Sequence, residues 1–115
     1  MPEFVETDVF SDQLQDLYDD HLLTKEGYRE LQNAILEENT RIDTIRHTGG
    51  LEKVRWGTRT GGKSGGLRII LYHHAPCSIY YLLFVYRKSE VSSLTSDQKK
   101  KLRRQVDYLI DAINC

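Results

Sequence analysis

The run Ile79 to Tyr86 constrains the fold more than any other stretch, because every residue in it is apolar or aromatic. A strand with one wet face alternates between apolar and polar residues, whereas a run that is apolar on both faces is typical of a central strand. The run is also far shorter than the roughly 18 apolar residues that would predict a membrane span. It therefore predicts a central strand of a sheet, one with neighbours on both sides, and no membrane partner.

Two further strands are predicted upstream, because the hydrophobic period changes to two after a glycine pair at positions 49–50. In Leu51 to Trp56, Lys53 and Arg55 share one face. In Leu67 to His73, the face that holds Arg68 lies opposite the apolar positions that begin with Leu67. Together with the central run these strands predict an antiparallel meander.

Helical spacing predicts an acidic helical hairpin between residues 8 and 38 and one more helix after residue 95. Asp8 or Ser11 is expected to cap the first helix and Thr24 the second. Thr95 and Gln98 have the spacing of a capping box for the third helix. With a short strand at Glu3 to Thr7, the order predicts a single α+β domain over residues 1–115, with an antiparallel sheet and its helices over one sheet face.

Charge is divided unequally along the chain. Residues 1–40 hold eleven acidic side chains against two basic ones, whereas residues 41–104 hold fourteen basic side chains against four acidic ones. Such a split predicts a polarised surface with a polyanionic partner on the basic side, although two solvated faces that attract each other are the simpler alternative.

The cysteines and histidines suggest neither a disulfide framework nor a metal site. Cys77 and Cys115 lack metal-ligand spacing and are expected to be free thiols in a reducing compartment, which favours the cytoplasm. The N-terminal residues do not have the pattern of a secretory signal. His73 and His74 are adjacent strand residues that point to opposite faces, so we expect no metal and no other cofactor.

Residues Gly57 to Ser64 match the phosphate-loop pattern G-x-x-x-x-G-K-[ST] letter for letter. A true phosphate loop needs a buried strand before it and a helix after it, whose N-terminal amides hold the phosphates. Here Lys63 and Ser64 are followed by two glycines and a strand. We therefore expect no nucleotide site in this segment.

Basic residues of the three predicted strands are expected to converge, because neighbouring antiparallel strands place side chains of one face side by side. Cations hold phosphate backbones, and tyrosines stack on or bond to bases and riboses. The residues in this predicted patch are Lys53, Arg55, Arg68, Tyr72, Tyr86 and Lys88. Arg59 and Lys63, on the glycine-rich loop, are expected to hold RNA backbone loosely beside it.

The strings HTGGLEKVRW, GGLRIILYH and YLLFVYRKSEVSSLTSDQ, with the order of elements, resemble the RelE/ParE toxin superfamily and most closely its HigB-like branch. The resemblance implies a small RelE-like domain. It implies the toxin of a type II toxin-antitoxin system that cleaves messenger RNA on the ribosome and inhibits translation. It also implies a cognate antitoxin, expected to be a small helix-turn-helix protein.

Carried over by position, the resemblance implies catalytic roles for Lys53, Arg68 and Lys88, with Arg55 beside them and with Tyr86 and Arg87 accompanying Lys88 as RNA-binding residues. The family's RelE pattern has a tyrosine shortly after the position of Lys88, but here Ser89 to Val91 follow. Tyr72 and Tyr86 are possible substitutes, and His73 is another if a bulge reverses its face.

Cleavage without a metal is expected to use the 2′-hydroxyl of the RNA as nucleophile, with Arg68 on the phosphate and Lys53 as base. Two alternatives remain open. One is a non-catalytic toxin of the same fold that binds a protein target such as DNA gyrase, and the other is an RNA-binding module without activity. The structural alternative for Arg68 itself is an ion pair with an acid of the helical hairpin.

Overall fold

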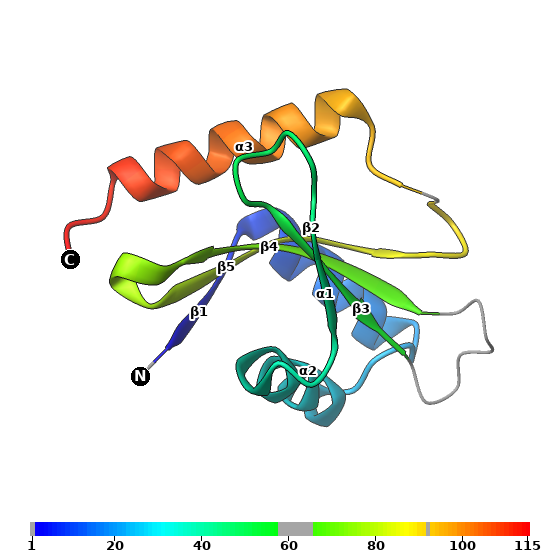
Figure 1. Cartoon of the computed structure of the whole chain (residues 1–115). Helices are drawn as coiled ribbons and strands as arrows, with labels where there is room; N and C mark the ends of the chain where they lie inside the picture. Colours follow the sequence, from blue (N-terminus) through cyan, green and yellow to red (C-terminus); the bar gives the residue numbers. More distant parts are fainter. Residues whose placement is uncertain (1, 58–65, 92) are drawn as a thin grey trace.

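The computed structural model describes residues 2–57, 66–91 and 93–115, and this part of the chain forms an α+β fold (Figure 1). The α+β class predicted from the sequence is confirmed. The elements in chain order are β1 (Glu3–Glu6), α1 (Asp8–Asp19), α2 (Lys25–Glu37), β2 (Arg41–Thr44), β3 (Glu52–Trp56), β4 (Leu67–His74), the 3₁₀ helix η1 (Ala75–Cys77), β5 (Ile79–Arg87) and α3 (Ser96–Asp111).

The sheet has five strands in the order β1-β5-β4-β3-β2, and it is mixed rather than antiparallel. β1 pairs with β5 in parallel, while the other neighbours are antiparallel. The prediction of a purely antiparallel sheet was therefore wrong at β1. β2 was not predicted from the sequence, because its four residues are too few to show a period. It lies at the edge of the sheet. The prediction that β5 is an interior strand is confirmed, because it lies between β1 and β4.

The helices cover both faces of the sheet, so the prediction of helices over one face was wrong. α1 and α2 lie on one side and α3 lies on the other (Figure 1). Leu82 of β5 belongs to the core under α1 and α2, whereas the adjacent Leu83 belongs to the core under α3. A strand that is apolar on both faces leaves apolar surface exposed unless something covers each face, and the two helical layers provide that cover.

Side-chain caps begin all three α-helices in the described residues. Thr7, rather than Asp8 or Ser11, caps α1 and accepts a hydrogen bond from the Phe10 amide at 3.2 Å. The cap at Thr24 and the capping box of Thr95 with Gln98 are both confirmed. The reason for the difference is that α1 begins at Asp8, so the capping position falls on Thr7, the single residue between the end of β1 at Glu6 and the helix.

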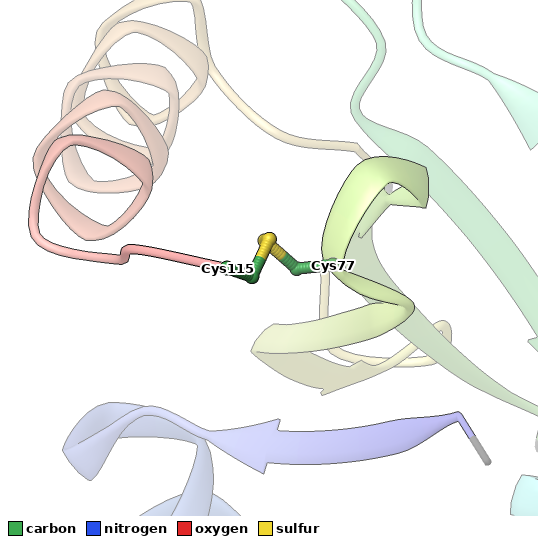
Figure 2. Close-up of a disulfide and its surroundings, with 2 residues drawn as sticks. All are labelled: Cys77 and Cys115. Atoms are coloured by element: carbon green, nitrogen blue, oxygen red, sulfur yellow. A yellow bond between two sulfur atoms is a disulfide. The ribbon is translucent and has the colours of Figure 1, made fainter.

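Cys77 and Cys115 are joined in a disulfide, so the expectation of free thiols was wrong (Figure 2). Their Cα atoms lie 5.7 Å apart, within the usual range for a disulfide. Cys77 ends η1 in the β4–β5 connection, and α3 runs back over the sheet so that the residues after it reach this connection (Figure 2). Two cysteines 38 residues apart give no such signal in the sequence, because only the direction of α3 brings them together.

Candidate functional site

Strand register brings basic residues of β3 and β4 together with a tyrosine of β5. Arg55 of β3 is directly opposite Arg68 of β4, and Arg68 is directly opposite Tyr86 of β5. Lys53 is opposite Ile70, whose side chain belongs to the core under α3. Because directly paired residues share a face, these side chains lie on the α3 side of the sheet. The convergence predicted from the strand pattern is thus present for Lys53, Arg55, Arg68 and Tyr86.

Lys88 adds its charge to this group from the turn after β5. Its amide donates a hydrogen bond to the Gly66 carbonyl at 3.0 Å, which holds the turn against the start of β4. The pKa of Lys53 is lowered, first by burial and then by the positive charges of Arg55, Arg68 and Lys88, while Asp43 opposes the shift. We call the set Lys53, Arg55, Arg68, Tyr86 and Lys88 the basic cluster.

Asp43 of β2 is a member of the site that the sequence analysis missed. Its Oδ2 atom lies 3.2 Å from Arg41 Nε and 3.4 Å from Arg55 Nε. The distance between Asp43 Oδ2 and Arg55 Nε is within the range of an ion pair, but both atoms are buried and neither forms a hydrogen bond among the described residues. We therefore regard it as an electrostatic contact that positions Arg55. The register of β2 places Asp43 opposite Lys53 and is the feature from which its position could have been found. That register could not be used because β2 itself was not predicted.

The guanidinium of Arg68 lies beside the residues at the start of β4. Its Nη1 donates to the Leu67 carbonyl at 3.1 Å, and a Cβ at Gly66 would lie 2.9 Å from the same nitrogen. Glycine at position 66 therefore leaves room for the guanidinium. Among the described residues no carboxylate lies within ion-pair distance of Arg68. Pairing with an acid of the helical hairpin is not made, because α1 and α2 cover the opposite face of the sheet.

Tyr86 places a phenol beside the two guanidinium groups. Only 7% of the residue is exposed. Burial raises the pKa of Tyr86, and the positive charges of Arg68 and Arg55 partly offset that rise. The phenol therefore stays protonated at neutral pH, where its hydroxyl can donate a hydrogen bond to an anion that the guanidinium groups hold.

Tyr72 lies away from the basic cluster, four residues along β4 from Arg68. The guanidinium carbon of Arg103 is 5.2 Å from the centre of the Tyr72 ring. A Cβ at Gly50 would lie 3.2 Å from the same ring. Tyr72 thus packs between α3 and the β2–β3 loop, where its evident role is structural, and its predicted RNA contact stays untested.

His73 and Arg87 lie on the other face from the basic cluster. The His73 ring stacks on Tyr80 with centroids 4.1 Å apart, and Tyr80 packs against the core under α1 and α2. The register shift between Ile70 and Leu71 does not bring His73 to the α3 side. Arg87 is opposite Leu67 and forms an ion pair with Glu90 at 2.7 Å. A contact of Arg87 with RNA bound at the cluster would therefore require another orientation of its side chain.

The predicted contacts of Arg59 and Lys63 lie outside the described residues, as does the phosphate-loop pattern after Gly57. Within residues 2–57, 66–91 and 93–115, no group of three or more His, Cys, Asp or Glu side chains is placed to hold a metal ion. No helix in the same ranges is long and apolar enough to cross a membrane.

No protein-family model matches this chain. The chemistry of the basic cluster indicates what the site can bind. Guanidinium groups bind two phosphoryl oxygens at once, lysines add point charge, and a protonated phenol donates one more hydrogen bond. These are the groups that hold a phosphodiester and stabilise charge that develops on it.

Replacement of Lys53 by methionine is expected to stabilise the fold at pH 7. The folded-state pKa lies below the unfolded value, so protonated Lys53 costs free energy at pH values below the folded pKa. This cost fades as the pH rises through the folded pKa and is absent above the unfolded pKa of 10.5. We expect a gain of up to about 1 kcal/mol in unfolding free energy at pH 7, the upper range for exposed charge pairs.

The gain is measured by urea unfolding of the wild type and K53M at pH 7 and pH 10, where the difference should shrink. Lys25→Met on exposed α2 is the matched control and should change little. A K53M protein less stable than the wild type at pH 7 would contradict the electrostatic account of the cluster.

Proposed function

We propose that this protein is a metal-independent endoribonuclease, the toxin of a type II toxin-antitoxin system with a RelE-like, HigB-like domain. The observation that carries the proposal is the row Arg55-Arg68-Tyr86 across three strands, with Lys53 and Lys88 beside it. The strings that resemble the RelE/ParE superfamily form β3, β4 and β5, the strands that build this row.

In the proposed reaction the 2′-oxygen of the RNA attacks the adjacent phosphorus and the bond from phosphorus to the 5′-oxygen breaks. Lys53, as a neutral amine, takes the proton of the 2′-hydroxyl, and its lowered pKa makes that form more accessible. Arg68 and Tyr86 hold the phosphoryl oxygens as negative charge develops on them. The Lys88 ammonium supplies a proton to the departing 5′-oxygen. The products are a 2′,3′-cyclic phosphate and a 5′-hydroxyl.

RNA is preferred as substrate because this mechanism needs a 2′-hydroxyl, and the cluster offers a base beside its phosphate-binding groups. The acidic helices lie on the opposite face from the cluster, so the charge split along the sequence becomes a split between two sides of the molecule. A polyanion would be guided to the cluster side. The partners proposed with this function are messenger RNA on the ribosome, in the cytoplasm, and a cognate antitoxin.

Primer extension on a message translated in a cell extract tests the proposal. Added protein should produce cuts in the translated reading frame, and the upstream fragments should end in a 2′,3′-cyclic phosphate, as the proposed reaction requires. Intact RNA together with inhibited DNA supercoiling would replace the proposal with a gyrase-binding toxin. Intact RNA with retained RNA binding would leave only a binding module.

A further inference from the structure

A second basic surface lies between the β2–β3 loop and the first half of α3. It is a groove of about 480 Å³, lined by Arg46, His47, Ser96, Lys99, Lys100, Arg103 and Arg104. No carboxylate and no tyrosine, phenylalanine or tryptophan is among these lining residues. It shares none of its lining residues with the basic cluster, so the proposed reaction does not account for it.

The wall formed by the β2–β3 loop is firmly held. Arg103 Nη1 donates to the Gly49 carbonyl at 2.8 Å, and Arg103 also forms an ion pair with Asp107 at 2.6 Å. Thr48 is buried, and its hydroxyl donates to the Ile45 carbonyl at 2.6 Å and accepts from the Leu51 amide at 3.2 Å. Figure 1 shows this loop rising from the β2–β3 edge to α3. Hydrogen bonds and an ion pair therefore hold both walls of the groove in place.

The helical wall carries its charge at a cost to the helix. Lys99 and Lys100 lie near the start of α3, where cations oppose the positive end of the helix dipole, and Arg104 follows one turn after Lys100. Among the described residues none of these three forms an ion pair with a carboxylate. Arg103 is occupied by Asp107 and the loop carbonyls, which leaves Arg46, Lys99, Lys100 and Arg104 as the lining cations that form no ion pair within the described part of the chain.

We propose that this groove binds the phosphate backbone of base-paired RNA, an inference that rests on the proposed action on RNA. A groove of cations without tyrosine, phenylalanine or tryptophan suits a duplex, because the bases of a duplex are stacked inside and it offers phosphates and 2′-hydroxyls to a protein. Proteins that hold single strands add aromatic side chains on which bases stack, and this groove has no tyrosine, phenylalanine or tryptophan. The basic cluster, which contains Tyr86, then takes the single strand while the groove holds a neighbouring helix of structured RNA.

The test uses the double variant K100Q/R104Q, which removes two exposed cations one helical turn apart on α3. Binding of a labelled RNA duplex is measured by fluorescence anisotropy over a range of salt concentrations. The affinity should fall by about tenfold to a hundredfold at low salt, and the slope of log affinity against log salt should become shallower by about 1.8, roughly 0.9 for each phosphate that is no longer neutralised. The control K25Q/R29Q removes two exposed cations with the same spacing from α2 and should change neither quantity.

An unchanged duplex affinity and slope in K100Q/R104Q would overturn the proposal. An equal loss for a single strand of the same sequence would overturn the assignment to a duplex, because the groove would then follow a single strand. The duplex measurement does not depend on cleavage. If the translated message stays uncut but K100Q/R104Q loses duplex affinity, the proposed enzyme activity is overturned and the duplex site stands. If the message is cut but the duplex affinity of K100Q/R104Q is unchanged, only the duplex site is overturned.

Discussion

Replacing Arg68 with alanine is expected to lower RNA cleavage by about 10²- to 10³-fold, the usual loss for one preorganised donor to a developing oxyanion. Its guanidinium lies between Arg55 and Tyr86 in the strand register. No carboxylate of the described residues neutralises it, so its charge is available to a phosphoryl group. The rate is measured by single-turnover cleavage on programmed ribosomes.

Two controls separate the chemistry of Arg68 from its packing. Arg68→Lys keeps the charge but loses the fork that holds two oxygens, so its rate should lie between those of the wild type and R68A. Arg87→Ala removes an arginine of the same sheet from the opposite face, where it pairs with Glu90, and should keep most of the activity. Cleavage by R68A at a rate near that of the wild type, with an unchanged melting temperature, would exclude Arg68 from the site.

The second large effect is expected from the disulfide. Reduction of Cys77–Cys115 releases a loop of 38 residues that contains β5 and α3, and the loss of its entropic constraint predicts a decrease of up to about 4 kcal/mol in unfolding free energy. Urea unfolding with and without reductant measures the decrease. Cleavage should survive in the reduced protein under conditions where it stays folded, because Arg68 lies at the other end of β4 from Cys77.

The single variant Cys115→Ser is the matched control, since it should behave like the reduced wild type and show no further response to reductant. Equal unfolding midpoints for the oxidised and reduced wild type would show that the disulfide adds nothing to stability. The proposed action in the cytoplasm makes the reduced form relevant, because thiols there are mostly kept reduced.

Local structure was predictable where neighbouring residues decide it. The caps at Thr24 and Thr95 follow from side chains that bond amides three residues away, and both are present. The alternation in β3 and β4 placed Lys53, Arg55 and Arg68 on one face correctly, because a strand has a period of two regardless of its neighbours.

The apolar run Ile79 to Tyr86 also predicts where the helices lie, and the expectation of helices over one sheet face did not take this into account. Its apolar residues on both faces require cover on both faces, which α3 and the helical hairpin provide. The expectation of helices on one face was therefore inconsistent with the pattern that identified the central strand. Helices on both faces of the sheet therefore follow from this run alone.

By itself the sequence determined the starts of α2 and α3, the central strand and the face that carries the basic residues, because each depends on side chains close together in the chain. Only the tertiary structure decided the parallel pairing of β1, the position of Asp43 beside Arg55 and the joining of Cys77 to Cys115. These features depend on the direction in which elements return to the sheet. Packing of the whole chain sets that direction, and no short pattern records it.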